Sequence, residues 1–223
     1  MSRFPFRAAV FDMDGTLVDN MGFHARAWLA LSARLGVSGV SAATFERDWA
    51  GHKNAEILPR LLGRPLAPDE LAALSEEKER CYRELYRPEL RPLPGLLAFL
   101  DELERAGVRL AVATAAPPGN RDLVLDGLGL RPRFARVIGA EHAPRGKPAP
   151  DIYQAAAAAL ELPPGECLAF EDALAGVQSA RAAGMRCVGL TTVVAARELT
   201  AAGAWLTAPD FTGLASRLAA GPG

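Results

Sequence analysis

Hydrophobic and polar positions alternate along this chain with two different periods. Residues 20–88 show only helical spacing, and no strand-like run interrupts it. The last segment opens with Pro68-Asp69-Glu70, which is typical of a helix start. The expected helices of this region are 23–35, 42–50, 55–62 and 68–86.

From residue 94 onward, short apolar runs alternate with helical segments. The expected strands are 108–113, 135–139, 167–170, 186–190 and about 204–206, and the expected helices are 95–106, 119–128, 149–160, 173–183 and about 195–202. Together with a strand at 7–12, this alternation predicts an α/β fold, a doubly wound parallel sheet of the Rossmann-like kind. We therefore expect a core formed by residues 1–19 and 89–223, and a helical domain, 20–88, inserted after the first strand.

Composition narrows the class of protein. Half of the 223 residues are apolar, which is enough for a substantial core, and a net charge of −1 gives no electrostatic reason to bind nucleic acid. No apolar run approaches the ~20 residues of a membrane span. Residues 1–7 lack the apolar stretch of a signal peptide, and three isolated cysteines indicate reduced thiols. We expect a cytoplasmic protein that binds neither nucleic acid nor a membrane.

Two aspartates follow the first predicted strand. If the strand continues through Asp12 and Asp14, both carboxylates lie on one side and Met13 lies on the other. Like charges this close are costly unless a divalent cation, a cationic side chain or a shared proton relieves the repulsion. The pair therefore indicates an active site.

Polar residues also follow the later strands, where a doubly wound sheet binds its ligands. Thr114 follows the second strand, Glu171-Asp172 ends the fourth, and Lys147 opens a helix between Gly146 and Pro148. Carboxylate oxygens suit Mg²⁺. Each residue also has a structural interpretation: a strand cap, a favourable charge pair at a helix start, and a surface cation.

Lysine is rare in this chain, which has three lysines and twenty-two arginines. Lys147 therefore stands out as a requirement for a compact ammonium group. Lys78 lies in a run of charged residues, and we interpret it as part of a solvated helix face.

The motifs Asp12-Met13-Asp14-Gly15-Thr16, Thr114, Gly146-Lys147-Pro148 and Glu171-Asp172 resemble, in order and spacing, those of the haloacid dehalogenase superfamily. Within it, the chain is similar to the branch of capped phosphatases and β-phosphoglucomutase-like enzymes. The resemblance extends over nearly the whole chain.

This resemblance implies covalent phosphoryl transfer. Asp12 would attack phosphorus and become an aspartyl phosphate, and Asp14 would act as general acid and base. Mg²⁺ would be held by Asp12, the main-chain carbonyl of Asp14 and Asp172, with Glu171 reaching it through water. Lys147 and Thr114 would bind the phosphoryl oxygens.

The helical insertion is expected to act as a cap that selects the substrate, a small phosphorylated metabolite such as a sugar phosphate. The candidate substrate contacts are His24, Gly51, His52, Lys53, Asn54 and, in the core, Ala115. His24 could instead be a half-buried histidine on an apolar face, and residues 51–54 could be an ordinary connection between helices. We expect a monomer or a weak homodimer.

Several activities stay open at this stage. A β-phosphoglucomutase grips a second phosphate, but Asn54 stands where that branch has an arginine, and Ala116-Pro117-Pro118 replaces its polar stretch. This pattern favours a phosphatase and keeps the mutase as the alternative, with Lys53, Asn120 and Arg121 as candidate substitutes for the second clamp. A phosphonate hydrolase using Lys53 is disfavoured by Asp14, and a receiver domain by the inserted helices; a non-catalytic binding protein is a remoter alternative.

Overall fold

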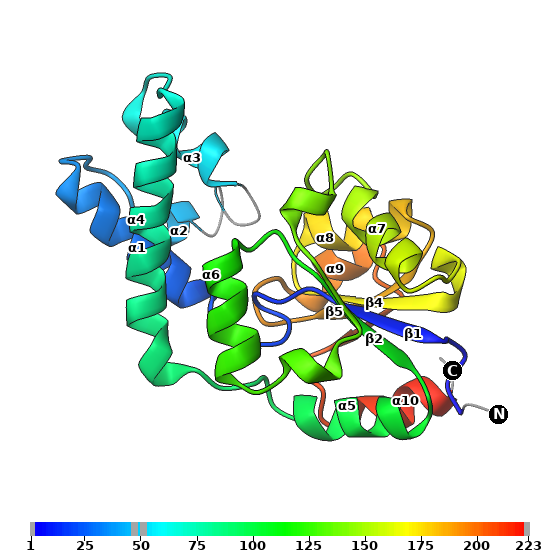
Figure 1. Ribbon diagram of the computed structural model, residues 1–223. Helices are drawn as coiled ribbons and strands as arrows, with labels where there is room; N and C mark the ends of the chain where they lie inside the picture. The colour runs from blue at the N-terminus through cyan, green and yellow to red at the C-terminus, as the bar shows by residue number, and fades with distance from the viewer. Residues whose placement is uncertain (1–2, 46–48, 50–52, 221–223) are drawn as a thin grey trace. The chain divides into compact units, whose positions relative to one another are not determined.

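A computed structural model describes residues 3–45, 49 and 53–220, and it separates into two compact units (Figure 1). The sheet unit consists of Met1–Asp19 and Arg91–Gly223. The helical unit consists of Asn20–Leu90. None of the described helices is both long and apolar enough to cross a membrane.

The sheet unit contains six parallel strands in the order β3-β2-β1-β4-β5-β6. Their bounds are β1 Ala8–Phe11, β2 Arg109–Ala113, β3 Arg136–Ile138, β4 Cys167–Glu171, β5 Arg186–Leu190 and β6 Leu206–Ala208. The chain lays down β1 to β3 towards one edge and then crosses to β4, which lies on the other side of β1. This reversal makes the carboxyl ends of β1 and its neighbours the switch point of the sheet.

Helices cover both faces of the sheet, as Figure 1 shows, so the predicted α/β doubly wound fold with a helical insertion is confirmed. One face carries α7 (Asp151–Ala159), α8 (Leu174–Ala182) and α9 (Ala196–Ala202); the other carries α5 (Leu96–Arg105) and α10 (Leu214–Ala220). Strands buried on both faces read as continuous apolar runs, which explains the buried sequence Ala-Ala-Val-Phe of β1.

Alternation along β1 divides the core into two layers of different composition. Ala8 and Val10 belong to a cluster of mostly small side chains with α7 and α8. Phe11 points to the opposite face and stacks on Phe170 of β4, with ring centroids 4.6 Å apart. Phe99 of α5 and Phe211, which precedes α10, complete this aromatic layer.

Three details of the sheet unit differ from the sequence prediction. The last strand is Leu206–Ala208 rather than 204–206, and the closing helix α10 was not predicted. The segment predicted as one helix at 119–128 begins as α6 (Pro118–Arg121) and widens into a π-helical turn at Asp122–Asp126. Short terminal elements carry too few periods for the hydrophobic pattern to define them.

The helical unit is built from α1 (Met21–Arg34), α2 (Ala42–Thr44), α3 (Asn54–Leu62) and α4 (Pro68–Tyr86). Its apolar core gathers Trp28, Phe45, Trp49 and Ile57 around the contact of these helices. Of the helix predicted at 42–50, the described residues include α2, and residues 46–48 and 50 lie outside the described part of the chain.

The interpretation of Lys78 as a solvated residue was wrong. Only 3% of Lys78 is exposed, and its Nζ lies 2.8 Å from Nδ1 of His24 and 2.9 Å from Oε1 of Glu79. The ammonium also lies 5.3 Å from the ring centroid of Trp28. The charged run hid this burial because α4 turns Lys78 and Tyr82, four residues apart, to one buried face.

The aromatic layer predicts a large asymmetry between two positions of α5. Phe99→Ala should lower the free energy of unfolding by about 3–5 kcal/mol, because it empties a buried site lined by other rings. Leu97→Ala, on the same helix but 46% exposed, should change it by no more than about 0.5 kcal/mol. Urea unfolding followed by circular dichroism measures both; similar losses in the two variants would contradict the packing described here.

Candidate active site

The site forms where β1 ends between β2 and β4. Phe11 pairs with Val112 on one side and with Phe170 on the other, so Asp12 lies level with the ends of both neighbours. The backbone amide of Asp12 continues the ladder by donating to the carbonyl of Phe170 at 3.0 Å. Parallel register thus brings Asp12 next to Glu171, although their residue numbers differ by 159.

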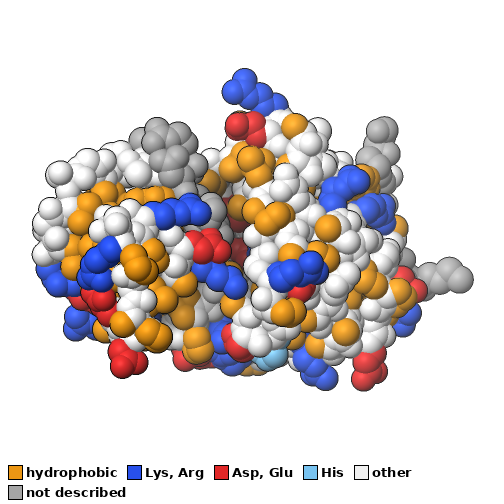
Figure 2. Space-filling model, turned by 90° about the horizontal axis from the view of Figure 1, so that it is seen from above, with side chains coloured by type: hydrophobic (Ala, Val, Ile, Leu, Met, Phe, Trp, Pro, Cys, Tyr) orange, Lys and Arg blue, Asp and Glu red, His pale blue; other side chains and the backbone are white. Residues whose placement is uncertain are grey.

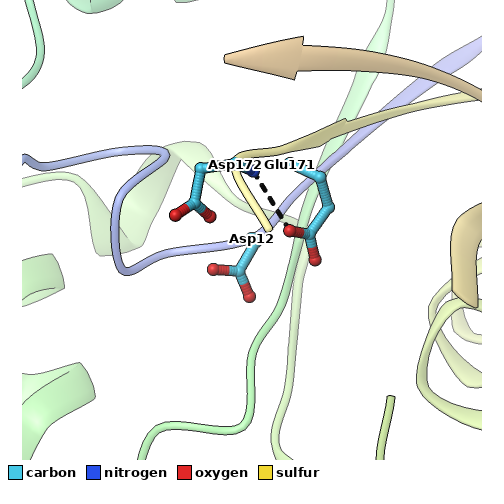
Figure 3. A group of neighbouring side chains, drawn as sticks. All are labelled: Asp12, Glu171 and Asp172. Atoms are coloured by element: carbon cyan, nitrogen blue, oxygen red, sulfur yellow. Dashed lines mark hydrogen bonds between the residues drawn. The ribbon is translucent and has the colours of Figure 1, made fainter. Parts of the chain in front are cut away.

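Three buried carboxyl groups meet at these strand ends. Asp12, Glu171 and Asp172 each offer an oxygen, and these oxygens all lie within 4.8 Å of one another. Figure 3 shows the three side chains converging from the ends of β1 and β4. The expected gathering of these three residues is therefore present in the structure.

Lys147 supplies the positive charge of the group. Its Nζ donates to Oδ1 of Asp12 at 2.6 Å and to Oε1 of Glu171 at 2.5 Å. A longer contact of 3.4 Å reaches the carbonyl of Ala113 at the end of β2. One ammonium thereby joins the ends of three adjacent strands.

Burial and the neighbouring charges shift the pKa values of these groups. Burial, with repulsion from Glu171 and Asp14, raises the pKa of Asp12 to about 7 despite the opposing attraction of Lys147. Burial and the charges of Glu171 and Asp12 likewise raise the pKa of Asp172 well above its ordinary value. Burial lowers the pKa of Lys147, but Asp12 and Glu171 outweigh that effect and hold it above its usual value.

These residues fit a divalent cation by charge and by donor type. Three ionised carboxylates and one ammonium would leave two negative charges uncompensated in a buried place. The raised pKa values of Asp12 and Asp172 mean that, without a cation, these two groups bind protons more readily and so reduce that charge. A doubly charged cation can replace those protons. Carboxylate oxygens are ligands that Mg²⁺ prefers.

Glu171 is held by four donors, two on each oxygen. Lys147 and the hydroxyl of Tyr153, at 2.8 Å, donate to Oε1; the backbone amides of Asp172 and Ala173 donate to Oε2 at 3.1 and 3.3 Å. Such a carboxylate is well placed to orient Lys147, and its water-mediated contact with a metal stays a prediction.

Tyr153 is a contributor that the sequence analysis missed. It lies on α7, six residues after Lys147, and is completely buried. Burial and the nearby carboxylates raise its pKa well above the ordinary value, so the phenol remains a donor. In the sequence, Tyr153 resembles any aromatic residue on the buried face of a helix. Only its hydrogen bond to Glu171, seen in the structure, connects it with the site.

The loop after β1 turns away from the strand direction. Because β1 ends at Phe11, strand alternation does not extend to Asp14, and Asp14 lies outside the group of three carboxyl groups defined above. Gly15 has a φ of +74°, and a Cβ there would stand 2.1 Å from Oδ2 of Asp172. Thr16 then donates its hydroxyl to Oδ1 of Asp172 at 3.3 Å.

Thr114 is buried at the end of β2, and Ala115 beside it is exposed. The oxygen of the Thr114 hydroxyl accepts the backbone amide of Ala116 at 3.1 Å. This arrangement caps the turn after the strand and still allows the hydroxyl hydrogen to be donated. Contacts of Thr114 and Ala115 with a substrate stay predictions.

The candidate substrate residues of the helical unit have contacts within that unit. His24 is buried, bonds to Lys78 and stacks on Tyr82 with centroids 3.8 Å apart. Asn54 donates to Oε1 of Glu79 at 2.8 Å, whereas Lys53 is exposed. Gly51 and His52 lie outside the described residues. Substrate binding by any of these residues stays a prediction.

A doubly wound sheet with buried carboxylates and an ammonium at its switch point defines an α/β enzyme with a site for oxygen-bound ligands. A family model described as haloacid dehalogenase-like hydrolase matches residues 6–184. The chain belongs to the haloacid dehalogenase-like hydrolases, and the resemblance found in the sequence is confirmed.

Individual relatives agree with this assignment. Protein CbbY of Rhodobacter capsulatus is 33% identical over 190 residues, which cover 82% of this chain and 84% of the relative. The fructose-1-phosphate phosphatase YqaB of Escherichia coli (strain K12) is 32% identical over 82% of this chain and 95% of its own. A crystal structure of β-phosphoglucomutase from Clostridium difficile matches with a TM-score of 0.82 at 26% identity, over 94% of this chain and 93% of that one.

The raised pKa of Asp12 predicts a pH-dependent affinity for Mg²⁺. Below about 7 a proton occupies Asp12 and competes with the cation, so affinity should increase as pH rises through about 7 and level off above it. Asp172→Asn should weaken binding by at least about tenfold, since it removes a charged oxygen from the group.

Calorimetric titration with Mg²⁺ alone measures this affinity. Glu198→Gln, an exposed acid on α9, is the matched control and should bind as the original protein does. Affinity that is equal at pH values on either side of 7, or equal in Asp172→Asn, would count against a cation site in this group.

Proposed function

We propose that this protein is a Mg²⁺-dependent phosphatase that hydrolyses a small phosphorylated metabolite, a sugar phosphate or similar phosphomonoester, through an aspartyl phosphate on Asp12. The observation that carries the proposal is the part-buried contact between Nζ of Lys147 and Oδ1 of Asp12, 2.6 Å apart, in a group of carboxylates suited to a divalent cation. Membership of the hydrolase family supports the class of reaction.

Asp12 would be the nucleophile in this reaction. Its carboxylate attacks phosphorus in line with the leaving oxygen, and water later attacks the phosphorus of the resulting acyl phosphate. Lys147 holds the Asp12 carboxylate in one direction and would bind the phosphoryl oxygens as negative charge shifts over them. Bound Mg²⁺ would offset the charge of both the nucleophile and the phosphoryl group.

Asp12, the main-chain carbonyl of Asp14 and Asp172 would hold the cation. Thr114 would donate its hydroxyl to a phosphoryl oxygen. Asp14, half-buried on the loop after β1, would protonate the leaving oxygen and then take a proton from the attacking water. A general acid and base contributes typically ~10²–10⁴-fold to such a rate.

The relatives support a sugar-phosphate substrate. YqaB is named for hydrolysis of fructose 1-phosphate, and the structurally similar mutase is named for phosphoglucose. We propose that the helical unit acts as the cap that selects the leaving group, with His24, Lys53 and Asn54 among its contacts. A cytoplasmic location is also proposed, which the free state of Cys81, Cys167 and Cys187 supports.

A mutase is the second candidate, and local contacts argue against it. Arg121, a candidate clamp for a second phosphate, forms an ion pair with Glu141 at 2.7 Å and is 7% exposed. Asn54 bonds to the carboxylate of Glu79. Both groups already face carboxylates, which would repel a second phosphate.

Removal of the nucleophile is the direct test of the covalent mechanism. Asp12→Asn should lower phosphate release from sugar phosphates by more than about 10³-fold, because an amide cannot form the acyl phosphate. Beryllium fluoride with Mg²⁺ should bind the original protein and lose affinity in this variant. Asp69→Asn, an exposed position on α4, is the control, and normal turnover by Asp12→Asn would refute the mechanism.

A product ratio separates phosphatase from mutase. With β-glucose 1-phosphate and a catalytic amount of glucose 1,6-bisphosphate, free phosphate and glucose should predominate, because Arg121 and Asn54, two candidate clamps among the described residues, already face carboxylates. Coupled assays quantify free phosphate and glucose 6-phosphate in one sample. Predominant glucose 6-phosphate would refute the phosphatase proposal in favour of the mutase. Arg121→Ala would then test whether Arg121 holds the second phosphate.

A further inference from the structure

The loop after β1 carries the proposed acid and base, Asp14, and is held at several points. Leu17 donates its amide to the carbonyl of Met13 at 2.8 Å, which closes a turn around Asp14 and Gly15. The bond from Thr16 to Asp172 ties the next residue to β4. The peptide between Gly15 and Thr16 has a further contact, at the carbonyl oxygen of Gly15.

Thr192 supplies that contact from a distant part of the chain. Its hydroxyl donates to the carbonyl oxygen of Gly15 at 2.6 Å, across 177 residues of sequence. Thr192 is half-buried and lies two residues after the end of β5. Its neighbour Thr191 is tied to β6, because its amide donates to the carbonyl of Ala208 at 2.9 Å. The hydroxyl of Thr192 is thus presented from a segment anchored to the sheet.

We propose that Thr192 is a positioning residue for catalysis, which holds the carbonyl of Gly15 and thereby sets the place of Asp14. This inference rests on the proposed phosphatase function. The backbone angles of Gly15 need a contact from elsewhere to fix them, since glycine is the residue least restricted in its backbone angles. Threonine suits the task because branching at Cβ restricts χ1, so its hydroxyl stays directed at one acceptor.

Two strands therefore hold two successive residues of the loop. β4 holds Thr16 through Asp172, and the segment after β5 holds Gly15 through Thr192. Asp14 directly precedes this pair. A displacement of about 1 Å at a reacting group can cost ~10²-fold in rate, so a contact that removes freedom from the loop should act on the proton transfers assigned to Asp14.

The test compares two replacements of one side chain. Thr192→Val keeps the shape and removes the hydroxyl, whereas Thr192→Ser keeps the hydroxyl. Thr191→Val is the matched control, because it removes the adjacent hydroxyl, whose contact is a 3.5 Å bond to the carbonyl of Ala208 rather than to Gly15. Each variant is assayed with an alkyl phosphate, which needs a general acid, and with p-nitrophenyl phosphate, which has a good leaving group.

For the alkyl ester, Thr192→Val should lower kcat by about tenfold with KM little changed, under conditions where phosphorylation of the enzyme limits the rate. For p-nitrophenyl phosphate the loss in kcat should be about threefold or less, because its good leaving group needs little acid catalysis. Thr192→Ser and Thr191→Val should retain most of the activity on both esters. In an Asp14→Asn background, Thr192→Val should cause no further loss.

Other outcomes overturn the inference in recognisable ways. Equal losses on both esters, or a full additional loss in the Asp14→Asn background, would show that Thr192 acts only on loop stability. Activity unchanged in Thr192→Val would show that its hydroxyl does not position the loop. Absence of Mg²⁺-dependent phosphate release from the original protein with either ester would overturn the proposed function itself, and this inference with it.

Discussion

The repulsion among three buried carboxyl groups is the constraint around which the sheet unit is organised. Asp12, Glu171 and Asp172 each have an oxygen within 4.8 Å of the others and are nearly sealed from water, and the single ammonium of Lys147 only partly compensates their charge. In water such groups would separate. Here the strand ends hold them together, which means that the folding energy of the sheet is spent in part on keeping this charge in place.

The surrounding backbone makes that crowding possible. Besides Gly15, Gly176 of α8 stands so close to Glu171 that a Cβ would lie 1.9 Å from its carboxyl group. Helix α8 can therefore pack directly over the end of β4, and the first amides after the strand can reach the carboxylate of Glu171. On the opposite face, the stacked rings of Phe11 and Phe170 hold β1 and β4 at fixed register. On the face of the molecule shown in Figure 2, basic and acidic side chains are interspersed, and the described residues form no continuous basic patch there.

Much of this arrangement could be predicted from the sequence, and the limits have physical reasons. Apolar runs that end in Asp12 and in Glu171-Asp172 indicate parallel strands with carboxylates at one edge, because each run encodes its own strand and end. Lys147 was found because lysine is rare. Tyr153 and Thr192 were not found, since their importance comes from partners that are distant in sequence, and an aromatic residue in a helix or a threonine after a strand has ordinary structural roles. Lys78 was misinterpreted for a related reason. The charged residues next to it in the sequence suggested exposure, whereas its burial depends on its contacts with His24 and Trp28 of α1.

The scarcity of lysine also has a chemical consequence. Lys78 is 3% exposed and held by Glu79 and His24, and Lys147 is engaged by two carboxylates, so both amines are shielded from solvent. Lys53 is the exposed member of the three. Amine-selective reagents under native conditions therefore have one preferred lysine among the three, Lys53 just before α3, and its modification would show whether this amine is needed for the proposed contact with a substrate.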